Sequence, residues 1–153
     1  MSELSNDAYE RVEDARIALE TLGMDAERSN ERSALVRLAL LRLTPAESWA
    51  EAANPMLGTR AIMDFIRDEY GKDYAPNTRE TVRRFTLHQF VEAQLVVQNP
   101  DEPQRPVNSP KWNYQVTAEA LDVLRAYGTD AWQSATDRYL ADLPGLKARY
   151  AAA

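Results

Sequence analysis

The chain has 153 residues, 44% of them hydrophobic, which suffices for one buried core and does not require a second independent domain. It has no cysteine and a single histidine, which excludes disulfides and thiolate chemistry and leaves no His/Cys cluster to bind zinc. Neither a run of about eighteen apolar residues nor a secretory leader occurs, so the sequence predicts a cytoplasmic protein without a membrane span.

Charge is distributed unevenly along the chain. The net charge is −6, and residues 1–57 carry six Lys/Arg against eleven Asp/Glu, whereas residues 58–111 carry eight of each. Nucleic-acid binding normally leaves a basic footprint, and the overall acidity is unfavourable to it. Residues 77–90 differ, with three arginines against one glutamate. The acidity is therefore mainly N-terminal, and this cationic segment is the best candidate for a DNA contact.

Two helices are predicted near the N-terminus, over residues 6–24 and up to residue 43. The first has an imperfect apolar face, made by Tyr9, Val12, Ile17 and Leu19. The second is broadly apolar, is capped by Ser29 or Asn30, and is ended by Thr44-Pro45. The second helix is therefore expected to lie in the core.

A third helix and a following one are predicted on either side of a short link. The third opens at Thr59 and stops at Gly71, and Asn77 and Glu80 then give the Asn-x-x-Glu start of a helix that runs to Gln94. These are the stop, turn and capping signals of a helix-turn-helix, although the turn is longer than the minimal one. Two simply packed helices would give the same signals.

The helix over residues 77–94 has two distinct faces. Its predicted buried side comprises Val82, Phe85, Thr86, Phe90 and Ala93. Its predicted exposed row comprises Asn77, Thr81, Arg84 and His88. Polar side chains at this spacing suit a helix lying in the major groove, where each base pair presents a distinct pattern of donors and acceptors. An ordinary solvated helix face would have the same composition.

After Gln94 the pattern changes to two strands, LVVQ and WNYQV, joined by a long loop. Four of the eight prolines lie in this loop, which stiffens its backbone. The loop also carries polar side chains that suit phosphates or the minor groove, namely Gln104, Arg105, Asn108, Ser109 and Lys111. The sequence thus predicts a DNA-contacting wing, and a plain exposed hairpin is the alternative.

A last pair of helical segments follows the wing. Thr117 is predicted to cap a helix that ends near Gly128, and residues 129–153 are helical in spacing but interrupted by Pro144-Gly145. The order of elements predicts a mainly α fold with a small β-hairpin wing, a winged helix-turn-helix with flanking N- and C-terminal helices. We expect an N-terminal extension over 1–27, the winged helix over 28–128, and a C-terminal extension or linker over 129–153.

The segment from Asn54 to Pro110 resembles the N-terminal domain of the BsuBI/PstI family of type II restriction endonucleases. The specific pieces are YAPNTRETVRR, HQFVEAQLV and NPDEPQRPVNSP, and the resemblance covers about two thirds of the chain. It implies a winged-helix recognition region, with a magnesium-dependent nuclease in a separate C-terminal domain and with dimers that cut a palindromic six-base site. DNA recognition rather than cleavage is therefore expected of this chain.

No catalytic centre is visible in the sequence. A magnesium nuclease needs an acidic residue followed by a Glu/Asp-x-Lys group, and the nearest candidate, Asp68 to Lys72, has the wrong spacing. His88 has no serine or cysteine nucleophile beside it, and no phosphate-binding glycine loop occurs. We expect no metal or small-molecule cofactor in this chain, with magnesium needed only by an absent nuclease domain.

The predicted partner is double-stranded DNA, and palindromic DNA would favour a homodimer. The predicted base contacts are Asn77, Thr81, Arg84 and His88; the predicted phosphate contacts are Arg79, Arg83, Arg105 and Lys111; the supporting contacts are Thr78, Gln104, Asn108 and Ser109. Two alternatives stay open: a stand-alone winged-helix transcriptional regulator, which needs no nuclease domain, and a winged-helix protein-interaction module, which the acidic balance favours. The three tryptophans are expected to be core anchors, with Trp112 beside the wing as the exception.

Overall fold

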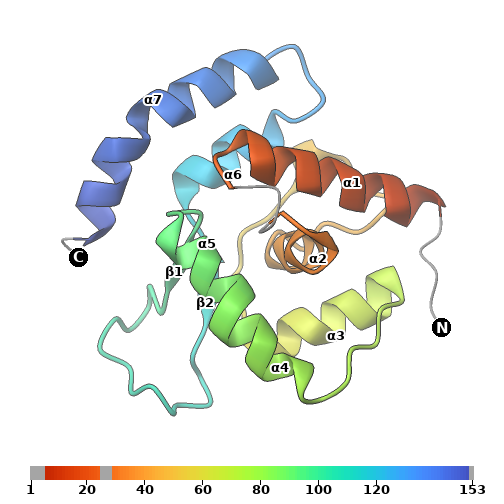
Figure 1. The fold of residues 1–153 in the computed structure, drawn as a ribbon, viewed down its shortest axis with the longest axis vertical. Helices are drawn as coiled ribbons and strands as arrows, with labels where there is room; N and C mark the ends of the chain where they lie inside the picture. The colour runs from red at the N-terminus through yellow and green to blue at the C-terminus, as the bar shows by residue number, and fades with distance from the viewer. Residues whose placement is uncertain (1–5, 25–28, 152–153) are drawn as a thin grey trace.

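The computed structural model describes residues 6–24 and 29–151, with the backbone alone for residues 146–151 (Figure 1). Its elements in chain order are α1 (Asn6–Thr21), α2 (Glu31–Leu40), a 3-10 turn (Trp49–Glu51), α3 (Thr59–Tyr70), α4 (Thr78–Thr81), a π-helical turn (Val82–Leu87), α5 (His88–Glu92), β1 (Val96–Gln98), β2 (Tyr114–Val116), α6 (Ala118–Arg125) and α7 (Trp132–Ala151). The predicted winged helix-turn-helix with flanking helices is thus confirmed.

Helix α2 forms the centre of the core, and α1, α3 and the π-helical turn pack against it. The Asn30 side chain caps α2 by accepting a hydrogen bond from the Ser33 amide, and every α2 residue from Ser33 to Leu40 is buried. The helix ends three residues before the predicted Leu43, because the chain turns at Arg42, whose φ is 51°. The broad apolar character of the segment thus correctly predicted that α2 is buried, but it placed the end of the helix three residues too late.

Arg37 of α2 is fully buried, which is unusual for a charged side chain. Its guanidinium carbon lies 4.8 Å from the centroid of the Phe90 ring in α5. Burial lowers the pKa of Arg37 to about 10, and none of its guanidinium nitrogens has a hydrogen-bond partner within the described residues. The contact between cation and ring thus joins α2 to α5 at the centre of the domain.

The predicted apolar face of helix α1 was partly wrong. Val12 and Leu19 are buried in the common core, but Tyr9 and Ile17 are 59% and 51% exposed. The buried side of α1 is completed instead by small residues, Ala8, Ala15 and Ala18, which allow α1 to lie close to α2. Small side chains carry little hydropathy signal, so the sequence pattern alone could not place them.

The ends of α3 and α6 follow their local signals. Gly71 adopts a left-handed conformation, with φ of 71°, and its amide donates to the Arg67 carbonyl at the end of α3. The Thr117 hydroxyl accepts a hydrogen bond from the Ala120 amide at the start of α6. Both predictions are therefore confirmed, and both depend on residues within a single helical turn.

The small sheet contains a pairing that the sequence did not reveal. Strands β1 and β2 are antiparallel, with Val97 opposite Gln115, and Leu57 forms a further antiparallel bridge with Tyr114. The Leu57 and Tyr114 backbones exchange two hydrogen bonds of 2.9 Å. The segment before α3, which the sequence presents as irregular, thereby attaches α3 to the base of the wing.

Helix α7 continues through Pro144, although the sequence predicted an interruption there. Proline removes one backbone donor and commonly bends a helix without ending it, and Figure 1 shows α7 curving along the side of the domain. Near its start, Trp132 packs on Tyr127, with ring centroids 4.9 Å apart, and Tyr127 packs on Trp49 at 5.1 Å. Within the described part of the chain, no helix combines the length and the apolar character that crossing a membrane requires.

Candidate nucleic-acid interface

The helix formed by α4, the π-helical turn and α5 presents a cationic outer face. The side chains of Arg84 and His88 are 70% and 62% exposed, and Asn77 is also exposed, whereas Thr81 is half-buried. The opposite side is fixed in the core by buried Val82 and Phe90. In Figure 1 this helix, drawn in green, lies on the side of the domain that faces the viewer. The predicted row of polar residues is therefore accessible along most of its length.

Phe85 departs from the predicted face, since its side chain is 57% exposed rather than buried. Leu87, which was not predicted to be buried, is fully buried instead, next to buried Thr86. The Arg32 Nε atom in α2 donates to the Thr86 hydroxyl at 3.1 Å, which fixes this part of the helix against α2. A π-helical turn is wider than an α-helical turn, so the angular phase of residues 82–87 differs from that of the 100° wheel. The phase change turns Phe85 outward.

Glu80 does not form the predicted capping box with Asn77, whose side chain makes no cap hydrogen bond. Its carboxylate instead pairs with two arginines of the same helix. The Arg83 Nε and Nη2 atoms donate to Glu80 Oε1 at 2.9 and 2.5 Å, and the Arg84 Nε atom lies 3.5 Å from Glu80 Oε2. Glu80 thereby neutralises part of the positive charge at the centre of the face.

The wing loop, residues 99–113, is organised by Arg105. Its side chain is only 7% exposed, and its two Nη atoms donate to both carboxylate oxygens of Asp101, at 2.9 and 3.2 Å. One Nη atom also donates to the Lys111 carbonyl at 2.9 Å and to Asn99 Oδ1 at 3.1 Å. The Asn113 amide donates to the same Asn99 oxygen at 3.0 Å, which closes the base of the loop.

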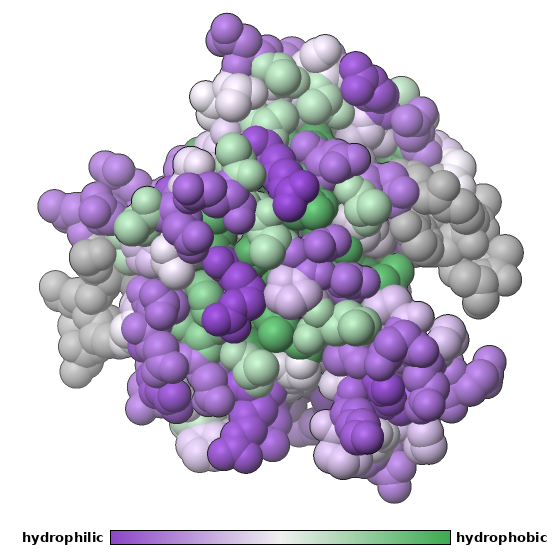
Figure 2. All heavy atoms as spheres, turned by 180° about the vertical axis from the view of Figure 1, so that it is seen from behind, coloured by the Kyte–Doolittle hydropathy of each residue, from purple (hydrophilic) through white to green (hydrophobic). Residues whose placement is uncertain are grey.

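Arg105 is therefore largely enclosed by its own loop and paired with Asp101, which disfavours the phosphate contact that the sequence predicts. The sequence could not distinguish an arginine that contacts DNA from one that holds the loop, because both occur among polar residues. Of the other predicted wing residues, Gln104, Asn108 and Lys111 are exposed and Ser109 is half-buried. In the rear view of Figure 2 the wing loop, at the lower right, forms a largely hydrophilic lobe.

Replacing Arg105 by alanine is expected to open the wing loop without unfolding the domain. Exchange of the Asn113 amide hydrogen should become faster by roughly tenfold or more, because a charge-assisted hydrogen-bond network is lost. Hydrogen exchange at single-residue resolution would measure this, with exposed Gln104→Ala as the matched control. Unchanged exchange at Asn113 would show that Arg105 does not hold the loop.

Acid should produce the same opening in the unaltered chain. The hydrogen bond from Arg105, assisted by that from Asn113, lowers the pKa of Asp101 from 3.8 to about 2. Because this pKa is lowered in the folded protein, the stabilising contribution is present above about pH 4 and is lost as the pH falls through about 2. The wing should therefore stay closed across the neutral range.

An open cleft of about 550 Å³ lies between the cationic helix and the wing. The helix contributes Arg83, Arg84 and His88, and the wing contributes Gln98, Val107, Trp112 and Tyr114. Trp49 is buried in the core, whereas Trp112 and Trp132 are both half-buried against it, so a distinct role for Trp112 stays a prediction. The helix face and the wing thus form two walls of one surface.

A second groove lies between α3 and the start of α4, and it adds a cation that sequence reasoning missed. Arg60 and Arg79 line it, together with Asp64, Arg67 and Asp73. Arg67 is engaged by Asp64 and Asp68, at 3.3 and 2.9 Å. Arg60 and Arg79 are exposed, and no ion pair to either occurs within the described residues. No local pattern distinguishes Arg60; its place beside the α4 start is a tertiary feature.

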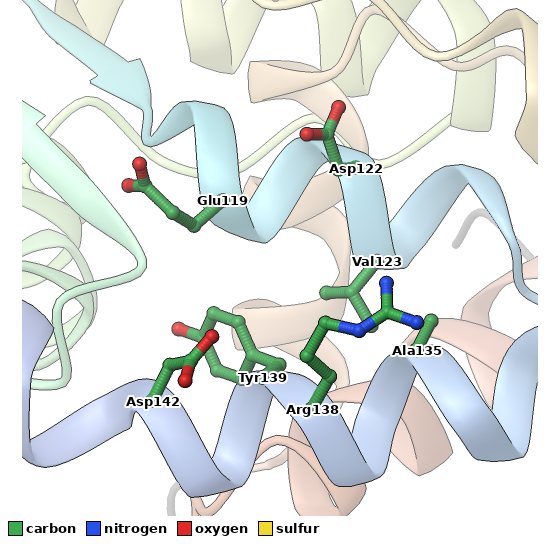
Figure 3. A pocket seen from close by; sticks show the side chains of 7 residues that line it. All are labelled: Glu119, Asp122, Val123, Ala135, Arg138, Tyr139 and Asp142. Atoms are coloured by element: carbon green, nitrogen blue, oxygen red, sulfur yellow. The ribbon is translucent and has the colours of Figure 1, made fainter.

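A third cleft, of about 230 Å³, separates α6 from α7 and has a different character (Figure 3). Carboxylates from both helices line it, Glu119 and Asp122 from α6 and Asp142 from α7, beside Arg138 and Tyr139. Within the described residues no group of three or more histidine, aspartate or glutamate side chains has an arrangement that could hold a metal ion. Its acidic lining makes this cleft unsuited to phosphate, so the cationic helix and the wing remain the candidate interface.

Comparison with known proteins identifies relatives of the whole described fold. Residues 9–148 match the family described as the BsuBI/PstI restriction endonuclease HTH domain. The chain is 47% identical over 143 residues to the type II restriction enzyme BsuBI of Bacillus subtilis and 35% identical over 139 residues to the type II restriction enzyme AplI of Arthrospira platensis. These alignments cover 94% and 91% of this chain, but 45% and 43% of the two enzymes.

A solved structure of the SdaI restriction endonuclease has the same fold. The two structures superpose with a TM-score of 0.82 at 36% sequence identity, over 98% of this chain and 47% of the SdaI chain. The chain therefore spans a little under half the length of each of these relatives. Identity above 30% along nearly the entire chain extends the sequence resemblance to both flanking helices.

Proposed function

This chain belongs to the BsuBI/PstI restriction endonuclease HTH domain family, and on that premise we propose that it binds double-stranded DNA with sequence specificity, as the recognition domain of a type II restriction endonuclease. The observation that carries the proposal is the joint surface of cationic helix and wing, with Arg84 and His88 exposed above one open cleft. A helix with such a face fits the width of the major groove.

The roles of individual side chains follow from their positions. Arg84 and Asn77, both exposed, are proposed to read base edges together with Thr81 and His88. Arg79, Arg83 and Lys111 are proposed phosphate contacts, to which the structure adds Arg60. Thr78, Gln104, Asn108 and Ser109 are proposed supporting contacts. Arg105 is assigned to holding the wing in shape.

The activity of the whole enzyme is a further part of the proposal. The matched restriction enzymes are about twice as long as this chain. We propose that cleavage and its magnesium requirement belong to a separate domain of such an enzyme, and that two copies of the recognition domain meet the two halves of a palindrome. The chain itself is proposed to need no cofactor.

Salt dependence tests whether DNA is the partner. With three to four phosphates contacted, the logarithm of the association constant should fall with the logarithm of the salt concentration with a slope of roughly −3 to −4. Fluorescence anisotropy with a labelled duplex at several salt concentrations would measure it. The alternative function, a protein-interaction module, is favoured by the acidic charge balance. It predicts no salt-dependent affinity for DNA.

Replacing Glu80 by glutamine should raise the affinity for DNA, because it removes a negative charge from the proposed interface and releases Arg83 and Arg84. We expect an increase of about three- to tenfold at low salt, which shrinks as salt screens the charges. Titration of the same duplex with both proteins would check this.

Glu20→Gln is the matched control, since it removes an equal charge from an exposed position on α1. If both variants gain affinity equally, the effect is one of net charge, and Glu80 has no special position on the interface. If Glu80→Gln loses affinity for one sequence while gaining it for others, Glu80 itself contacts a base. The proposal that Glu80 weakens DNA binding by neutralising Arg83 and Arg84 would then be wrong.

A further inference from the structure

Phe85 is a large aromatic side chain that the fold leaves exposed. Its 57% exposure contrasts with Phe90 and Leu87 of the same helix, which are fully buried. Burying a phenylalanine side chain stabilises a fold substantially, so an exposed ring forgoes that stabilisation. No ring stacking or cation contact to Phe85 occurs within the described residues. Packing inside the domain therefore does not account for it.

The position of Phe85 relates it to the proposed base-reading residues. It follows Arg84 directly in the π-helical turn, and Thr81 and His88 stand just before and just after that turn in the same helix. Arg83, Arg84 and His88 line the cleft towards the wing, whereas Phe85 does not. The Phe85 ring is therefore exposed next to Arg84 in sequence, but outside the cleft that Arg84 lines.

The chemistry of the major groove limits what such a ring can meet there. Base edges in this groove present hydrogen-bond donors and acceptors, with one apolar group among them, the 5-methyl group of thymine. An aromatic ring that covered a hydrogen-bond donor or acceptor of a base would leave that group unpaired, which would weaken binding. A ring that covered a methyl group would bury apolar surface and strengthen binding. The two adjacent side chains would then read different features of neighbouring bases.

We propose that Phe85 is a specificity-determining residue that packs its ring on the 5-methyl group of a thymine in the major groove. This assignment rests on the proposed function, since it requires that the helix bind DNA through its exposed face. It explains why the exposed face of a DNA-reading helix carries a phenylalanine beside an arginine. It also predicts that the bound sequence contains a thymine whose methyl group matters.

Deoxyuridine substitution tests the proposal, because uracil lacks the methyl group and keeps the hydrogen-bonding edge of thymine. In the duplex that the chain selects, each thymine is replaced in turn, and affinity is measured for the unaltered chain and for Phe85→Ala. At one thymine position per half-site, the unaltered chain should lose roughly fourfold in affinity. Phe85→Ala should be weakened on the thymine duplex by a similar factor and should not respond to that substitution.

Two variants serve as controls. Phe85→Leu keeps an apolar surface and should retain the preference for thymine, whereas Tyr9→Ala removes an equally exposed aromatic ring from α1 and should change nothing. If no deoxyuridine substitution weakens the unaltered chain, or if Phe85→Ala stays sensitive at the same position, the proposal is overturned while sequence-specific binding stands. If the chain binds no duplex at all, the proposed function is wrong, and the role proposed for Phe85, which depends on it, is wrong as well.

Discussion

Replacing Phe90 by alanine is expected to lower the free energy of unfolding by about 3–5 kcal/mol. The ring is fully buried, joins α5 to α2, and lies 4.8 Å from the guanidinium of buried Arg37. Its removal would leave a cavity and would also deprive the Arg37 guanidinium of its contact with the Phe90 ring, which adds to the cost. Urea denaturation followed by circular dichroism would measure the change.

The matched control is Val91→Ala, which truncates the next, half-buried residue of the same helix. Its effect should be about 1 kcal/mol or less, because less apolar surface is removed from the core. If Phe90→Ala cost no more than Val91→Ala, the α4–α5 helix would not be anchored at Phe90. The rigid presentation of its outer face would then need another explanation.

Replacing Arg84 by alanine is expected to reduce discrimination between DNA sequences by about 1–3 kcal/mol at one base pair of each half-site. The side chain is 70% exposed, at the centre of the helix face, and its contact with Glu80 is a surface ion pair that costs little to break. An arginine in this position is suited to a bidentate contact with guanine. Competition binding with single-base variants of the selected duplex would locate the relaxed position.

Lys111→Ala provides the contrast, because Lys111 lies in the exposed wing and is proposed to contact phosphate. It should weaken all sequences alike and make the salt slope shallower by about one. If Arg84→Ala also weakened every sequence equally, Arg84 would be a phosphate contact. The helix face would then position the domain on DNA without reading the bases.

The parts of the fold that could be predicted from the sequence are those set by local interactions. Gly71 ends α3 because the left-handed turn there favours glycine, and Thr117 begins α6 because its hydroxyl caps an amide three residues on. The change from helical spacing to the segments LVVQ and WNYQV after Gln94 correctly predicted both strands of the wing. Each of these interactions involves residues only a few positions apart, so it forms in almost any tertiary environment.

Features determined by tertiary packing could not be predicted in this way. Phe85 is exposed because Leu87 and Thr86 take the space against α2 and the π-helical turn changes the phase of the face. Arg105 is enclosed because Asp101 and Asn99 converge on it when the loop folds. The same residue types in the same order would fit either outcome, so only the three-dimensional arrangement separates a contact residue from a structural one.

Selection from a randomised duplex pool tests the central claim most directly. The purified chain would be incubated with the pool at low and moderate salt, and the retained duplexes would be sequenced. We expect enrichment of a palindromic site that persists at moderate salt and is lost in Arg84→Ala. Retention without enrichment would reduce the helix face to phosphate contacts, and the absence of binding at both salt concentrations would contradict the assignment of this surface to DNA.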